Sequence, residues 1–375
     1  MRKSLTRMLT SGVRPGAAVS ALASLLFVLA PTATVLAGST SYEADDKRTV
    51  EVRAETQIYV KNARGKTIIV GRTDTDQVVV RAHKVIRAKD AETAAEWMDE
   101  LAFSIGTDGE QISGITHHPE RSEKGGSFWA FLMGIRHHAY IDYTIEGPAD
   151  FGAKVSSTSG DVQITSLGGD IKLFGSSGDV FLSHIGGSAF VEISSGDAEV
   201  NDVAQNFHIR MSSGDAAVRG VGGTLNVQGT SGDAKVYDVG GDVSIELASG
   251  DVTLDGGGAD AVLATISGDT HIRGVKGGIT ATSNSGDISA AINPAGSREF
   301  VFKASSGDVE VSFELAADDG FALEVTTSSG SIEGELDIEL DQISRRVLSG
   351  VVGDGEGRLY IETASGDIRI RQIGR

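Results

Sequence analysis

Aspartates that recur at a fixed interval are the residues of this chain best placed to do chemistry. Each follows a Ser-Gly dipeptide, and they occupy every eighteenth position: Asp161, Asp179, Asp197, Asp215, Asp233, Asp251, Asp269 and Asp287. If the units stack as paired strands, neighbouring carboxylates lie about 4.8 Å apart and repel by about 1 kcal/mol in water. Such a column needs hydrogen-bond donors, water or cations, and calcium is the metal that carboxylate oxygens suit.

A second turn halfway between the aspartates provides an internal comparison. The equivalent position there holds Asp170, Ser188, Asn206, Thr224, Asp242 and Asp260. These residues share a side-chain oxygen that can accept a backbone N–H, and they do not share a charge. The comparison favours a structural ladder of turn hydrogen bonds. Calcium along the aspartate column stays open as the alternative, although the calcium-binding nonapeptide GGxGxD is absent. No other cofactor is predicted.

Two histidine pairs, at 117–118 and 137–138, bracket an apolar run. A transition-metal site is one interpretation, but adjacent strand residues face opposite sides, so each pair can offer one imidazole to a given site. The apolar run is too short to span a bilayer. It is therefore either a buried hairpin or, at 127–135, an exposed contact for a partner or a membrane surface. The residues of that contact would be Phe128, Trp129, Phe131, Leu132 and Met133.

Motifs for known enzyme classes are absent or broken. The chain has no cysteine, no GxSxG and no HExxH. Gly65-Lys66-Thr67 resembles the end of a phosphate-binding loop, but Val60 stands where that motif requires glycine. A polysaccharide lyase or hydrolase on a β-helix remains the enzymatic alternative, and it would need an irregular carboxylate cluster where this chain has a regular ladder. We expect no catalytic residues and no enzyme activity.

The repeat that carries the aspartates predicts the fold. Residues 159–293 divide into fifteen nonapeptides without an insertion, and all but the one at 267–275 have two apolar residues spaced two apart, as in Val162 and Ile164. This spacing is typical of a short strand with one buried face, and strands this short are stable only when stacked. Two nonapeptides make one coil. The sequence predicts an all-β, single-stranded β-solenoid, a rod of roughly 36 Å over the regular part.

The remaining segments divide the 375-residue chain into three parts. Residues 1–37 have a basic start, an apolar stretch and the small-residue site Val35-Leu36-Ala37, which is typical of a secretory signal peptide. Residues 38–150 are predicted to form a β-rich region with one helix at 90–102, begun by Asp90, that could cover the open end of the rod. Residues 151–375 form the solenoid, irregular after 294, with a loop around 340–357.

Several of these segments resemble a known family. Ile145-Glu146-Gly147-Pro148 precedes the first turn, SSGDV-like units repeat, and Thr363 to Ile368 close the pattern. Together they are similar to the bacterial putative-adhesin family of β-strand-repeat domains of unknown function, from about residue 45 to the end. The resemblance implies a secreted or envelope-located β-solenoid, and it brings no catalytic residues.

Charge and export set the expected function. The net charge is −19, and removal of the signal peptide would make it −23. A polyanion repels nucleic acid, so no nucleic-acid partner is expected. We expect a non-catalytic extracytoplasmic binding or adhesion surface, or an envelope scaffold, in the periplasm or at the cell surface. Its partner would be an envelope protein or a polysaccharide. The alternative is a periplasmic signalling or stress-response accessory that docks a membrane partner through 127–135. Oligomeric state is left open.

Overall fold

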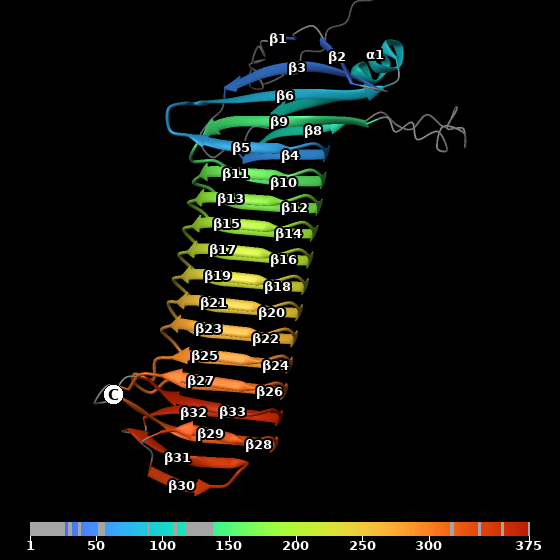
Figure 1. Cartoon of the computed structure of the whole chain (residues 1–375). Coiled ribbons are helices and arrows are strands. Elements are labelled where there is room, and N and C mark those ends of the chain that lie inside the picture. Colours follow the sequence, from blue (N-terminus) through green and yellow to red (C-terminus); the bar gives the residue numbers. More distant parts are fainter. Residues whose placement is uncertain are drawn as a thin grey trace, which may run out of the picture.

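The protein is a straight rod of stacked two-strand coils, with an antiparallel layer and one helix at its N-terminal end (Figure 1). The structure is a computed structural model, and it describes residues 27–28, 32–36, 39–51, 57–88, 90–107, 111–117, 138–315, 319–336, 339–353 and 356–373.

Each regular coil gives one strand to each of two parallel sheets, which we call sheet A and sheet B. Sheet A contains β11 (Val162–Leu167), β13 (Val180–Ile185), β15 (Ala198–Val203), β17 (Ala216–Val221), β19 (Ala234–Val239), β21 (Val252–Gly257), β23 (Thr270–Val275), β25 (Ile288–Ile292) and β27 (Val309–Phe313). Sheet B contains β10 (Gly152–Ser159), β12 (Ile171–Ser177), β14 (Ala189–Ser195), β16 (Phe207–Ser213), β18 (Leu225–Ser231), β20 (Val243–Ser249), β22 (Ala261–Ser267), β24 (Ile279–Ser285) and β26 (Glu299–Ser306).

The strand register confirms the predicted β-solenoid. Val162 pairs with Val180, and Val180 pairs with Ala198, so each step along sheet A is one coil of two nonapeptides. The alternate apolar residues point into the rod, and Val236 and Leu254 have no exposed surface. Side chains that alternate with them point outward, because successive residues of a strand face opposite sides. The core is therefore a continuous apolar filling between the two sheets.

The N-terminal region continues the same stack. Strands β4 (Gln57–Arg64) and β5 (Thr67–Arg72) pair in parallel with β10 and β11 and make one more coil. Beyond them lie β8 (Gln111–His117) and β9 (His138–Pro148), then antiparallel β7 (Ala102–Thr107), β6 (Gln77–Ala88) and β3 (Ser39–Glu51). The coil formed by β4 and β5 lies within the part of the chain predicted as a separate N-terminal region.

The expected helix is present as α1 (Ala91–Glu100). Asp90 caps it, and its side chain accepts the Thr93 N–H at 2.9 Å. Ala94 is buried, and the helix contacts β6 and β3, so it covers the antiparallel layer at this end of the rod. Strands β1 (Phe27–Val28) and β2 (Thr32–Leu36) also pair with β3, and both lie within the predicted signal peptide.

The C-terminal end differs from the expectation of coils in simple chain order. Strands β32 (Gly357–Ser365) and β33 (Ile368–Gln372) lie between the β26–β27 coil and the coil of β28 (Gly320–Ser329) and β29 (Ile332–Glu335) (Figure 1). The predicted loop at 340–357 is also wrong, because β30 (Glu339–Ile343) and β31 (Val347–Gly353) pair antiparallel there and β31 joins β28. These two strands cover the last parallel edge, which would otherwise be open to pairing with another chain.

Candidate binding surface

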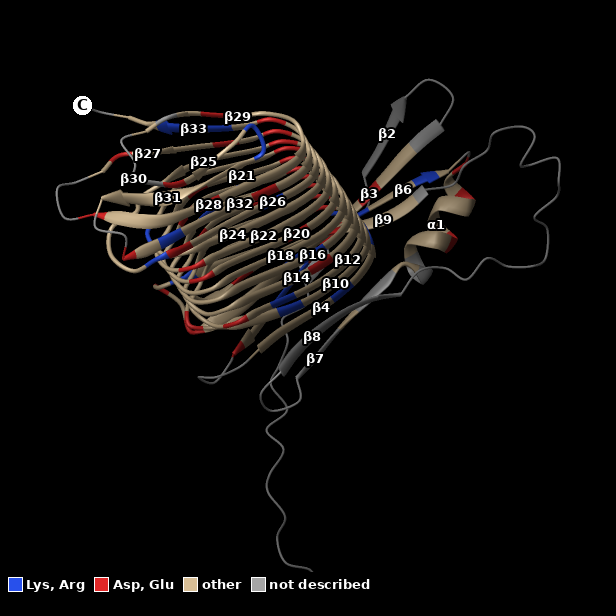
Figure 2. Ribbon diagram, turned by 90° about the horizontal axis from the view of Figure 1, so that it is seen from below, with Lys and Arg blue, Asp and Glu red and all other residues tan. Residues whose placement is uncertain are grey.

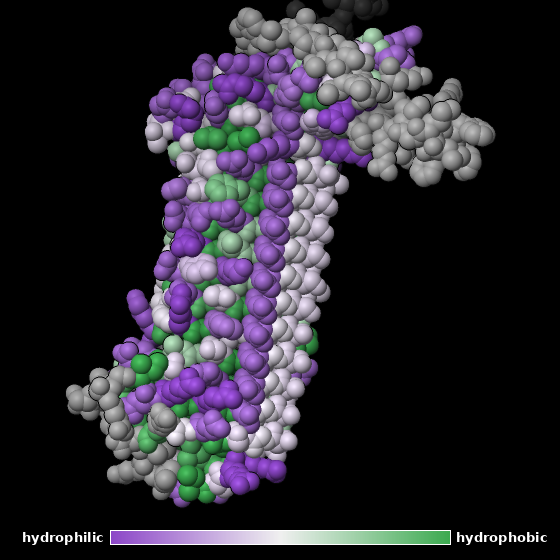
Figure 3. Space-filling model, in the orientation of Figure 1, coloured by the Kyte–Doolittle hydropathy of each residue, from purple (hydrophilic) through white to green (hydrophobic). Residues whose placement is uncertain are grey.

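The eight predicted aspartates stack at the corner where each sheet-B strand leads into a sheet-A strand (Figure 2). The Oδ1 of each aspartate accepts the backbone N–H of the aspartate one coil further on. The distance is 3.1 Å from Asp161 to Asp179 and 2.8 Å from Asp269 to Asp287. Each carboxylate therefore ties its coil to the next coil, and the column appears as an unbroken hydrophilic stripe beside near-neutral columns (Figure 3).

The column is longer than the regular repeat. Beyond Asp287 it continues through Asp308 and Asp367 and ends at Ser331, whose N–H donates to Asp367. At the other end, the N–H of Lys66 donates to the Asp142 carboxylate, and Lys66 takes the column position next to Asp161. Asp308, Asp367 and Ser331 each follow a Ser-Gly dipeptide, so the sequence pattern indicates them although they fall outside the constant interval. Lys66 and Asp142 carry no such signal.

The second turn uses the same bond with both charged and neutral side chains. Asn206 Oδ1 accepts the Thr224 N–H at 2.9 Å, and Asp170 Oδ1 accepts the Ser188 N–H at 2.9 Å. An amide oxygen thus accepts the same inter-coil hydrogen bond as a carboxylate oxygen. Within the residues that the structure describes, no three His, Asp or Glu side chains come together as a metal-binding group.

The remaining predicted contact residues, Phe128, Trp129, Phe131, Leu132 and Met133, lie outside the described residues. The same holds for His118 and His137, whereas His117 ends β8 and His138 begins β9. The described helix α1 is not long and apolar enough to cross a membrane.

Asp367 and His208 are among the titratable groups on the rod whose pKa values are shifted. The pKa of Asp367 is lowered because it accepts hydrogen bonds from the backbone N–H and the hydroxyl of Ser331. The pKa of His208 is lowered mainly by burial, with a smaller contribution from the positive charge of Arg210. The His208 ring stacks on Phe190 at a centroid distance of 5.1 Å, so it belongs to an aromatic row on the outer face of sheet B.

A groove of about 610 Å³ lies on the outer face of sheet A, directly beside the aspartate column. Successive strands β11, β13, β15, β17 and β19 line it, so it runs along the rod and across the strands. Its outward side chains are Gln163, Phe181, Glu199, Asn201, Ala217, Arg219, Lys235 and Tyr237. The small side chain of Ala217 lies between those of Glu199 and Lys235 in one column, which deepens the groove at that point.

Contacts within the groove hold its polar groups in place. Asn201 Nδ2 donates to Glu199 Oε1 at 3.1 Å. The Arg219 guanidinium lies 4.6 Å from the centre of the Tyr237 ring, a cation–π contact. The groove thus combines aromatic rings with amide, carboxylate and cationic groups within a few coils.

Comparison with known families agrees with this architecture. A model of the family described as Toastrack DUF4097 matches residues 149–237 and 221–371, more than half of the chain. The chain belongs to the Toastrack DUF4097 family. The resemblance inferred from the sequence is confirmed at the level of an adhesin-like domain of unknown function. A comparison with curated proteins found no match.

Several solved structures are similar to this Toastrack chain over most of its length. One is a putative adhesin from Bacteroides fragilis, with 13% sequence identity and a TM-score of 0.21. The match covers 87% of this chain and 96% of the Bacteroides fragilis chain. Another is a putative lipid binding protein from Parabacteroides distasonis, with 12% sequence identity and a TM-score of 0.28. The match covers 87% of this chain and 96% of the Parabacteroides distasonis chain. A third is a putative cell adhesion protein from Clostridium sporogenes, with 9% sequence identity and a TM-score of 0.19. The match covers 88% of this chain and 98% of the Clostridium sporogenes chain.

The groove residues of the Toastrack rod were not singled out from the sequence. They occupy the variable position between the two buried residues of each nonapeptide and the outward position that follows. Aligning the repeats would place Phe181, Glu199 and Lys235 in one column. That alignment indicates which side chains are neighbours, but the depth of the groove depends on their conformations.

Proposed function

We propose that this protein is an extracytoplasmic, non-catalytic binding rod whose sheet-A groove receives a segment of an envelope polysaccharide. The observation that carries the proposal is the direction of the groove. It crosses five successive strands along the rod, a length of about 19 Å at the spacing of paired strands. A site of this form fits an extended chain with repeating units better than a compact small molecule.

The groove chemistry suits sugar rings. The Phe181 ring, and the face of Tyr237 that is turned away from Arg219, are apolar surfaces against which the C–H face of a sugar can pack. Glu199, Asn201 and Lys235 supply acceptors and donors for hydroxyl groups. Because Asn201 already bonds Glu199 and Arg219 already lies over Tyr237, part of the conformational cost of ordering these side chains is met before the ligand arrives.

Binding to an array of immobilised envelope glycans tests the proposal. We expect the intact protein to retain at least one polymeric glycan, and Tyr237→Ala and Asn201→Ala to weaken that binding at least tenfold. Thr253→Ala and His271→Ala are matched controls, because both are outward-facing sheet-A residues outside the groove. Failure of the protein to bind any glycan, or equal binding by Tyr237→Ala, would reject the proposed ligand class.

Location is tested separately by protease digestion. We expect the protein to be absent from the cytoplasm, because residues 1–37 have the pattern of a signal peptide. Digestion in intact cells would indicate the outer surface and an adhesion role. Protection until the envelope is opened would indicate the periplasm, whereas protection in osmotically opened cells would contradict export.

A further inference from the structure

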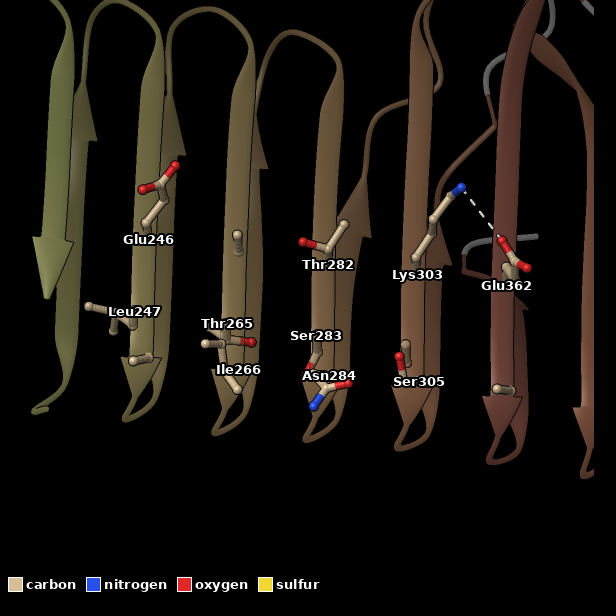
Figure 4. A pocket seen from close by; sticks show the side chains of 14 residues that line it. Glu246, Leu247, Thr265, Ile266, Thr282, Ser283, Asn284, Lys303, Ser305 and Glu362 are labelled. Atoms are coloured by element: carbon tan, nitrogen blue, oxygen red, sulfur yellow. Dashed lines mark ion pairs between the residues drawn. The ribbon is translucent and has the colours of Figure 1, made fainter. Parts of the chain in front are cut away.

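A second groove, of about 580 Å³, lies on the outer face of sheet B, on another side of the rod from the proposed glycan groove. Strands β20, β22, β24, β26 and β32 line it, near the ends that lead into the aspartate corner. Figure 4 shows Glu246 at one end, the Lys303–Glu362 ion pair at the other, and Thr282 and Ser283 between them. Because β32 is the inserted C-terminal strand, this groove exists only in the folded coil order.

The centre of this groove is apolar and accessible. Ala264 and Ile266 of β22 line it, and Ile266 is 59% exposed. Val262, which is 51% exposed, continues the same outward face of β22 just beyond the lining. Val262 and Ile266 are two of the five large hydrophobic side chains that are exposed among the described residues. Exposed apolar residues gathered on one strand and rimmed by charges are typical of a protein-binding surface.

Small side chains and acidic groups define what can bind there. Ala248, Ser305 and Ala364 lie in the lining and allow a ligand to approach the backbone closely. Glu246 and Glu362 outnumber the single cation Lys303, so the rim carries a net negative charge. The complementary ligand has bulky apolar side chains flanked by basic residues.

The chain itself contains such a ligand. Residues 121–138 include Phe128-Trp129-Ala130-Phe131-Leu132-Met133, with Lys124 before this run and Arg136 after it. This segment holds three basic residues and one acidic residue, a net of +2 in a chain whose net charge is −19. It is therefore complementary to the sheet-B groove in both hydrophobicity and charge.

The segment cannot reach the groove of its own rod. It is tethered to β8 and β9, and β4, the partner of β8, is seven coils away from β22, about 34 Å along the rod. The stretch 118–137 gives two arms of about ten residues, and each arm spans at most about 36 Å when fully extended. Each arm would have to be almost fully extended to reach β22, so no residues between the arms would remain to bind in the groove.

We propose that the apolar segment Phe128–Met133 of one molecule binds the sheet-B groove of a second copy of this chain. The segment belongs to the N-terminal end of the rod and the groove lies in its C-terminal half, so a single contact leaves one segment and one groove free. Repeating the contact produces open chains or rings, and two reciprocal contacts between antiparallel rods produce a closed twofold dimer. The inference is independent of the proposed glycan groove, which lies on the other sheet.

Sedimentation of the protein from residue 38 onward tests the assembly. We expect the average mass to rise with concentration, and both Trp129→Ser/Phe131→Ser (the segment variant) and Val262→Glu/Ile266→Glu (the groove variant) to remain monomeric. Thr253→Glu is the matched control on sheet A and should assemble normally. An equimolar mixture of the segment variant and the groove variant should form dimers and nothing longer, because each supplies one intact half of the contact.

Binding of a synthetic peptide that spans positions 121–138 gives a second readout that does not depend on assembly. Its Trp129 emission should shift to shorter wavelength with the segment variant of the rod and stay unchanged with the groove variant. A protein that is monomeric at every concentration, or a groove variant that assembles or binds the peptide normally, would overturn the proposal. So would a monomeric protein whose segment Phe128–Met133 instead binds vesicles of phosphatidylglycerol and phosphatidylethanolamine.

Discussion

Replacing Asp233 with asparagine separates the two roles open to the aspartate column, hydrogen bonding and charge. Asp233 Oδ1 accepts the Asp251 N–H at 2.9 Å, and its own N–H donates to Asp215 Oδ1 at 2.9 Å. Asparagine keeps an oxygen at Oδ1 and loses the negative charge. Asn206 already makes the same bond at 2.9 Å in the second turn, so the geometry suits an amide.

The expected free energies follow from the spacing of the coils. At about 4.8 Å, each neighbouring carboxylate repels Asp233 by about 0.9 kcal/mol in water, so Asp233→Asn should stabilise the rod by up to about 1.7 kcal/mol at low salt. Salt screens this repulsion and should reduce the gain. Asp233→Ala relieves the same repulsion but leaves the Asp251 N–H without its acceptor. It should be less stable than Asp233→Asn by about 1–3 kcal/mol.

Urea unfolding at low and high salt, each with chelator and with millimolar calcium, measures these differences. Asn206→Asp is the control, because its column neighbours Ser188 and Thr224 are neutral and the added charge should change stability little. The reasoning is refuted if Asp233→Asn loses as much stability as Asp233→Ala, or if chelation lowers the unfolding midpoint of the unmodified protein. The first result would mean that the column works through its charge, and the second would mean that it binds cations.

Four further outcomes are expected. Gly232→Ala should lower the free energy of unfolding by more than about 3 kcal/mol and so reduce the melting temperature, because φ is +119° and a Cβ would lie 1.9 Å from the Gly214 carbonyl oxygen. Gly296→Ala, where φ is +69° and nothing lies within 4 Å, should cost only about 1 kcal/mol in the same thermal melt. Leu254→Ala should destabilise by about 2–5 kcal/mol in urea unfolding, because the side chain has no exposed surface. Asp367 has a lowered pKa, so it stabilises the folded state above its ordinary pKa and this contribution is lost as the pH falls through the folded value. Melting at pH values from 7 to about 3 should therefore show a smaller decrease for Asp367→Asn than for the unmodified protein.

Much of the rod could be predicted because the residue patterns that specify its coils each span only a few neighbouring residues. The interval between Asp161 and Asp179 gives the length of a coil, and the pair Val162 and Ile164 gives the buried face. Both are properties of a few neighbouring residues. Asp170 and Asn206 both have a side-chain oxygen, which indicates a hydrogen-bond acceptor in the turn. The sequence does not show that this oxygen accepts a backbone N–H from the next coil.

The surfaces were less accessible to the same reasoning. Glu199 and Lys235 belong to coils that are not adjacent, and they flank Ala217 only because three coils are stacked in register. Lys66 joins the aspartate column because β5 pairs with β11, a strand far from it in the chain. Contacts of this kind depend on long-range pairing, which residue spacing does not specify.

The sequence by itself determined the coil, its buried residues and its turns, since each of these features recurs in every regular coil with the same local pattern. Only the tertiary structure decided the order of the last coils. Ser306 could pair equally well by pattern with Ser329 or Ser365, because every coil presents the same edge of N–H and C=O groups. Ser365 occupies the position beside Ser306, and the β28 coil is left at the end, where β31 and β30 cover it. The inserted β32 also supplies Glu362, and so the sheet-B groove is formed by a pairing that no local pattern distinguishes.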